Sequence, residues 1–166
     1  MDRAPEPHLG PEPGRLPSDR CALLVGVLER HTQTSDECSY GLWIGWGDLR
    51  TGVPLVAGGP SRKEMRHRRV DADREEELLR SIPRVQGGHG RDYLLFRGPA
   101  SAACSFESMP GHFQPPSLWP NDRAWVVVAE IDGLSTYVGG SREAIGDVVA
   151  SADIEAIEVT RDVRMD

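Results

Sequence analysis

The residues of this sequence that could do chemistry stand at the two ends of one apolar segment. Asp122 and Arg123 precede the segment, and the carboxylates Glu130 and Asp132 follow it. Carboxylates beside an arginine can act as a general acid and a general base, or can hold a divalent cation through oxygen ligands. His112, in the proline-containing stretch before the segment, is a further catalytic candidate.

The spacing of these residues argues against one compact site. Asp122 and Asp132 are ten residues apart, which corresponds to about 30 Å along an extended strand. Glu130 and Asp132 share one face of such a strand and could join a ligand shell with a neighbouring strand. In the alternative interpretation, which we favour, Asp122 caps the Pro-Asn-Asp turn and pairs with Arg123 or Arg97, while Asp132 forms the Asp-Gly turn.

Tryptophan residues provide a second set of candidates, for binding rather than catalysis. Trp43 and Trp46 flank Gly45 in a segment whose apolar residues alternate with glycines, and Trp119 and Arg123 complete the candidate binding set. Tryptophan combines a large apolar ring with a polar N–H group, and it occurs both at interfaces and in cores. For Trp43 and Trp46 we favour a place in the core, and a binding surface is the alternative.

The apolar segment itself predicts a strand at 124–131. Three consecutive valines follow Trp125, a pattern typical of a strand that is buried on both faces. Alternating residues and turn signals predict further strands, at 39–45, 92–97, 135–138 and, partly exposed, 154–159. We expect the strand at 92–97 to neighbour the strand at 124–131.

Helical periodicity and capping residues predict two helices, at 19–31 and 142–152. Ser18 and Ser141 are suited to cap their N-termini. One apolar face of the second helix should cover Trp125; it comprises Ile145, Val148 and Val149. Together these elements predict an α+β fold, with an antiparallel sheet of about four to five strands and two helices packed on one face.

The domain organisation follows from the distribution of proline, glycine and charge. This distribution predicts a disordered tail at 1–17, a single α+β domain at 18–159 and a charged tail at 160–166. Within the domain, 59–90 predicts a flexible charged insertion with at most one short helix, near 75–82. The stretch 100–120 predicts a long loop.

The composition limits the class of partner. The chain has 166 residues, a formal net charge of −7 and a pI of about 5.2, which disfavours a nucleic-acid partner and suits a basic protein. No apolar run approaches the ~20 residues that span a bilayer, and the sequence does not begin with a signal peptide, so we expect a cytoplasmic protein. The three widely spaced cysteines predict reduced thiols and neither a disulfide framework nor a metal site; they are Cys21, Cys38 and Cys104. No cofactor is expected.

Three motifs of this chain resemble those of a family of uncharacterised actinobacterial proteins. The motifs are RDYLLFRGP, LWPNDRAWVVVAEID and STYVGGSREAI. The resemblance covers roughly 20–50 and 91–159, and it implies no particular reaction. Where members of the family carry a second tryptophan, this chain has Leu118 directly before Trp119.

Two functions are consistent with these observations. The first is a non-catalytic protein-binding module similar to the immunity proteins that neutralise toxins, by analogy of size and class with SUKH-like domains. The second is a hydrolase or metal-dependent enzyme that uses the carboxylates Glu130 and Asp132, with His112 or Asp122. The first is favoured because the chain lacks a recognisable catalytic motif.

Overall fold

The structure is a computed structural model that describes residues 16–45, 77, 80–87, 90–108, 117–129 and 133–160. The tails predicted at either end of the chain lie almost entirely outside the described residues, as does most of the predicted insertion. Within the described part, Glu77, Arg80 and Ser81 are helical, in agreement with the short helix predicted near 75–82.

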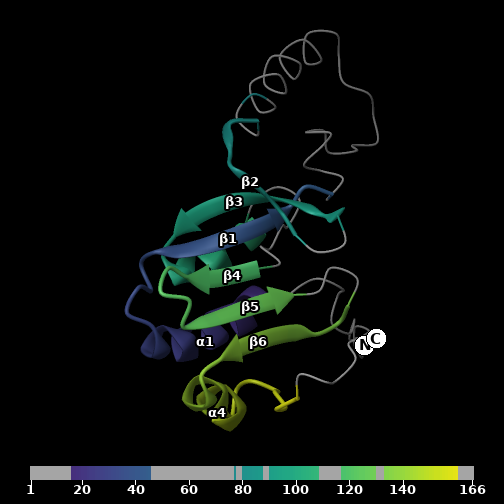
Figure 1. Ribbon diagram of the computed structural model, residues 1–166. Coiled ribbons are helices and arrows are strands. Elements are labelled where there is room, and N and C mark those ends of the chain that lie inside the picture. Colours follow the sequence, from purple (N-terminus) through teal and green to yellow (C-terminus); the bar gives the residue numbers. More distant parts are fainter. Residues whose placement is uncertain are drawn as a thin grey trace, which may run out of the picture.

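The described strands form one antiparallel sheet of six strands, in the order β2-β3-β1-β4-β5-β6 (Figure 1). The strands are β1 (Cys38–Trp43), β2 (Arg84–Gln86), β3 (Asp92–Gly98), β4 (Ser117–Pro120), β5 (Trp125–Ala129) and β6 (Thr136–Gly140). The predicted α+β class with an antiparallel sheet is confirmed, and the sheet has slightly more strands than expected.

Helix α1 (Ser18–Leu28) lies behind the sheet in Figure 1, and helix α4 (Arg142–Ala150) lies beyond β6. The 3-10 turn η1 (Glu29–His31) continues α1, and the 3-10 helix η3 (Ala100–Ser108) packs against α1. Nε2 of His31 lies 2.9 Å from Oδ2 of Asp147, so the end of the first helical segment contacts α4.

One main core fills the space between these helices and the sheet. It includes Leu24 and Leu28 of α1, Tyr40 of β1, Trp125 of β5 and Val148 of α4. Trp125 is only 1% exposed and shares this core with Val148 of α4, which confirms its predicted burial, whereas Val149 of the predicted covering face is 41% exposed. Because burial of large apolar side chains is the main driving force for folding, this tryptophan marks the centre of the fold.

The prediction that the valine-rich strand is buried on both faces is wrong. Burial alternates along β5: Trp125, Val127 and Ala129 face the helices, whereas Val126 is 39% and Val128 37% exposed. Consecutive β-branched residues favour a strand on either face of a sheet. Their presence therefore does not show that helices cover both faces.

Four further expectations are corrected. Strand β3 does not neighbour β5, because β1 and β4 lie between them. Strand β4 lies in the stretch 100–120 that was predicted as a loop, and β2 lies at the edge of the sheet within the predicted insertion. The predicted strand at 154–159 is not a strand.

The two predicted helix caps differ in outcome. The hydroxyl of Ser141 accepts a hydrogen bond from the N–H of Ala144 at 3.1 Å, as expected for an N-cap. Helix α1 instead begins at Ser18 and has Pro17 in the cap position. The Ser18 hydroxyl donates to the carbonyl oxygen of Cys104 at 3.2 Å, so this serine joins α1 to η3.

Candidate functional site

The turn between β4 and β5 carries two of the candidate catalytic residues. It is closed by a hydrogen bond from the N–H of Arg123 to the carbonyl oxygen of Pro120, at 3.0 Å. Arg123 has a positive φ of 57°, a conformation that is uncommon for residues other than glycine. Such a conformation persists only where neighbouring contacts hold it, and here the side chain of the preceding residue, Asp122, makes those contacts.

Asp122 accepts hydrogen bonds from three groups. The Thr32 hydroxyl lies 2.8 Å from both carboxylate oxygens, the N–H of Gln33 donates at 2.9 Å, and the N–H of Ala124 donates at 3.1 Å. The backbone N–H of Asp122 in turn donates to the hydroxyl of Thr34 at 3.0 Å. The carboxylate therefore fixes the turn to the segment that follows η1.

These hydrogen bonds also favour the ionised form of Asp122. The N–H of Gln33, followed by the hydroxyl of Thr32 and the N–H of Ala124, lowers the pKa of the carboxyl below its ordinary value. A carboxylate that stays ionised and has its oxygens occupied is poorly suited to donate or accept a proton in catalysis. The arrangement thus favours the structural interpretation of Asp122 as a turn cap.

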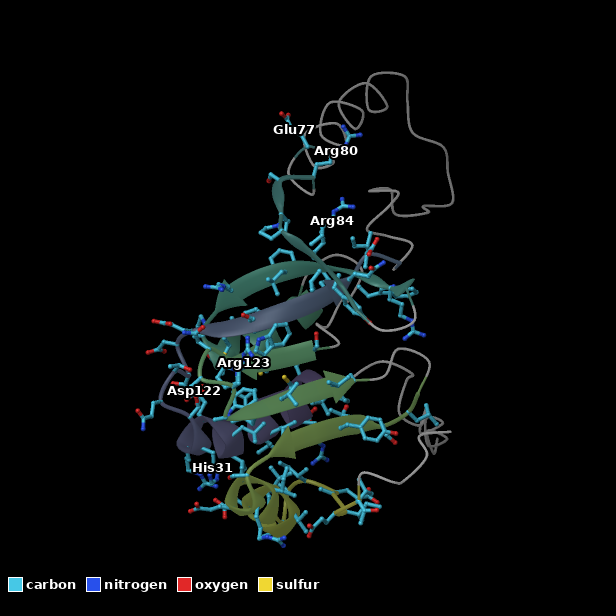
Figure 2. All side chains as sticks on the ribbon, viewed as in Figure 1. His31, Glu77, Arg80, Arg84, Asp122 and Arg123 are labelled. Carbon is cyan, nitrogen blue, oxygen red and sulfur yellow. The ribbon has the colours of Figure 1, made fainter. Side chains whose placement is uncertain are left out.

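The predicted ion pair of this carboxylate is not formed. Among the described residues, the salt bridges include none between Asp122 and Arg123 or Arg97. Figure 2 shows Asp122 and Arg123 at the same end of the sheet, with Arg123 closer to strands β4 and β5. The Thr32 hydroxyl and the N–H of Gln33 bind the carboxylate in place of a guanidinium. The fold brings the segment that contains them beside the turn.

An open groove of about 650 Å³ lies next to this turn. It is lined by residues of β4, the β4–β5 turn, β5 and β6, namely Trp119, Arg123, Ala124, Trp125, Val126, Gly139 and Gly140. Side chains alternate between the two faces of a strand, and Leu118 points into the core. Trp119 therefore faces away from the helices, on the same side as the exposed Val126.

Gly139 keeps this groove open. It pairs with Val126 in the β5–β6 ladder, and a Cβ atom at this position would lie 3.2 Å from Cγ1 of Val126. Arg123 is exposed and Trp119 is partly buried. The groove thus combines an accessible guanidinium with part of an indole ring.

Carboxylates lie close to the groove, around the same turn. The side-chain amide of Asn121 donates to Glu37 at 3.3 Å. Burial, and then the negative charges of Glu29, Asp122 and Asp36, raise the pKa of the Cys38 thiol to about 11. Arg123 therefore stands at the border of an acidic region. We call this region, comprising Glu29, Asp36, Glu37 and Asp122, the acidic rim.

The other candidate residues fall into two groups. Trp43 is among the described residues. In the sheet, Trp119 pairs with Ser39 of β1, and Trp43 lies four residues further along β1, which is about 13 Å from Ser39. Its ring is stacked under the guanidinium of Arg91 at 5.8 Å, so it belongs to a different part of the sheet. Trp46, His112, Glu130 and Asp132 lie outside the described residues.

Among the described residues, no group of three or more His, Cys, Asp or Glu side chains is placed to hold a metal ion. The described part also contains no helix of sufficient length and apolar character to cross a membrane. The groove residues Val126, Gly139 and Gly140 were not anticipated, since the register that brings β6 beside β5 has no local sequence pattern.

No family model, no curated protein and no solved structure matches the chain.

Proposed function

We propose that this chain is a non-catalytic protein-binding module, and that its partner docks on the groove beside the β4–β5 turn. The observation that carries the proposal is the pairing of Trp119 with an exposed Arg123 over an open groove. Tryptophan and arginine are the residue types most enriched among those that dominate binding energy at interfaces. Small-molecule sites enclose most of their ligand, whereas an open groove suits a protein surface.

A basic protein is the partner that the electrostatics favour. The chain has a formal net charge of −7, and the acidic rim lies beside the groove, with Asp36 and Glu37 exposed. Such a surface attracts a positively charged partner and opposes nucleic acid. Arg123 would then pair with a carboxylate of the partner at the centre of the contact.

This proposal is of the immunity-protein type, in which an acidic module blocks a basic protein in the cytoplasm. The proposal also assigns the chain to the family of uncharacterised actinobacterial proteins whose motifs it resembles. The enzymatic alternative loses one of its residues, because the Asp122 carboxylate is occupied by the groups that fix the turn.

A pull-down with matched variants tests the proposal. Purified chain is immobilised and exposed to lysate of the native host at about 50 mM and about 300 mM salt, since screening weakens contacts between exposed charges. We expect a basic protein to be recovered at low salt and less of it at high salt. Trp119→Ala should reduce recovery at least about tenfold, as for a residue that dominates an interface.

Two controls make the result specific to the groove. Val85→Ala changes an exposed apolar residue of β2 at the opposite edge of the sheet, and it should leave recovery unchanged. Trp43→Ala separates the two described tryptophan candidates. If no protein is recovered at low salt, the binding function is contradicted; if Trp43→Ala abolishes recovery and Trp119→Ala does not, the groove is the wrong surface.

A further inference from the structure

Two of the three cysteines, far apart in the sequence, lie side by side in the fold. Cys21 belongs to α1 and Cys104 to η3, and their Sγ atoms are 3.3 Å apart, although 83 residues separate them. Both side chains are thiols. Cys21 is 8% exposed, whereas Cys104 is partly exposed, so Cys104 is the more accessible residue of the pair.

The surrounding structure holds this pair in place. Helix α1 packs closely against η3, and the hydroxyl of Ser18, one turn before Cys21, donates to the carbonyl oxygen of Cys104. Cys21 belongs to the main core, and Cys104 packs against it. A disulfide has an S–S distance of about 2.05 Å, so the two sulfur atoms need to move together by only about 1.3 Å.

The third cysteine has a different environment. Cys38 is fully buried in β1, and its Sγ lies 3.5 Å from the carbonyl oxygen of Ser35. Burial and nearby carboxylates raise the pKa of its thiol to about 11, and the thiol form is a poor nucleophile. Cys38 therefore serves as an internal control for the reactivity of the other two.

We propose that Cys21 and Cys104 are a site of reversible oxidation, at which hydrogen peroxide converts the two thiols into an intramolecular disulfide. The Cys104 thiolate attacks one peroxide oxygen, the O–O bond breaks, and sulfenic acid and hydroxide form. The Cys21 thiolate then attacks the Cys104 sulfur, the S–O bond breaks, and a second hydroxide leaves. The two thiol protons convert both hydroxides to water, and the sulfur atoms together lose two electrons.

This modification would join α1 covalently to η3, and it goes beyond the proposed binding function. The groove is lined by residues of β4, the β4–β5 turn, β5 and β6, and none of them belongs to α1 or η3. A dithiol reductant reverses the reaction by thiol–disulfide exchange. The resulting disulfide closes a loop of 83 residues, which restricts the unfolded chain and stabilises the folded one.

Peptide mapping of the full chain tests the proposal. Fully reduced protein is treated with hydrogen peroxide, remaining thiols are alkylated, and the protein is digested with trypsin. Each cysteine falls in a separate peptide, at 21–30, 31–50 and 98–123. We expect 21–30 linked to 98–123, with Cys38 alkylated, an intact mass lower by two hydrogen atoms, and loss of the link after reduction.

Variants and a stability measurement complete the test. Cys38→Ser should form the same link, whereas Cys21→Ala should leave Cys104 without a partner and open to further oxidation. Oxidation should raise the Tm of the parent chain by roughly 5–15 °C and leave that of Cys21→Ala unchanged. Alkylation of both cysteines after peroxide treatment, a link to Cys38, or a link between two chains would overturn the proposal.

Discussion

Two tryptophans of the β4–β5 hairpin have opposite environments. Both line the open groove, but Trp125 is 1% exposed and belongs to the main core, whereas Trp119 is partly exposed and faces away from the helices. Within the described residues, Nε1 of Trp125 is buried without a hydrogen-bond partner, which costs free energy. Burial of the large apolar ring therefore outweighs the cost of the unpartnered N–H group at this position.

Replacement of Trp125 should be the most destabilising change among the described tryptophans. Trp125→Ala leaves a cavity in the core, and we expect the free energy of unfolding to fall by ~3–5 kcal/mol. Trp125→Phe, which keeps most of the ring and removes the unpartnered N–H, should cost clearly less. Trp119→Ala and Trp43→Ala should each cost less than Trp125→Ala. Chemical denaturation ranks the four variants. A Trp125→Ala protein as stable as its parent would contradict the placement of Trp125 at the centre of the fold.

Asp122 should make the stability of the fold depend on pH. Its folded pKa is lowered by hydrogen bonds, so its contribution is complete above the ordinary aspartate pKa of about 3.9 and is lost as the pH falls through the lower folded pKa. We expect the free energy of unfolding of the parent to fall more steeply below about pH 4 than that of Asp122→Asn. Urea denaturation at several pH values measures this slope.

The control for this experiment is Asp153→Asn, which removes one negative charge at a residue outside the turn. This variant should keep the slope of the parent at low pH. If Asp122→Asn and the parent instead give parallel pH profiles, the hydrogen bonds to Asp122 do not stabilise the turn.

At the scale of secondary structure, the sequence predicted the elements that have strong local patterns. The alternation in β1, the apolar runs of β3 and β5, the turn signals around β6 and the periodicity of α1 and α4 all correspond to described elements. The short strands were missed. β4 contains a proline and follows a proline-containing stretch, and the three exposed residues of β2 have no apolar pattern.

The candidate site was predictable only where its contacts are local. The Pro-Asn-Asp sequence indicated a turn capped by Asp122, and this was found. Its donors Thr32 and Gln33 lie about 90 residues away, and no local pattern indicates such long-range partners. The groove depends on the pairing of β5 with β6, and the thiol pair depends on the packing of α1 against η3.

The cap of helix α4 should have a measurable contribution to stability. The Ser141 hydroxyl accepts the hydrogen bond from the N–H of Ala144, which has no partner within the helix. We expect Ser141→Ala to lower the free energy of unfolding by about 1 kcal/mol, and Ser141→Asp to retain most of it. Ser151→Ala, at the other end of α4, is the control. Equal stabilities of Ser141→Ala and the parent would show that the cap is dispensable.

For the whole molecule, the order of the strands determines where local opening is most difficult. Strand β1 has β3 on one side and β4 on the other, whereas β2 is an exposed edge strand of three residues. We expect the amide protons of β1 to exchange most slowly and those of β2 to exchange fastest, because edges open without breaking the core. Hydrogen exchange followed by NMR measures this order, and equal protection of β1 and β2 would contradict it.

The central position of β1 also has a kinetic consequence. β1 pairs Cys38 with both Gly98 and Pro120, so long segments of chain must be closed before it can enter the sheet, and closure costs entropy. β4, β5, β6 and α4 follow one another directly and make local contacts, which form sooner. Substitutions in β5 and β6 should therefore slow folding, and substitutions in β1 should mainly accelerate unfolding, in stopped-flow experiments. Strand β1, through which β3 and β2 attach to the sheet, then joins the β4–β5–β6 unit late in folding.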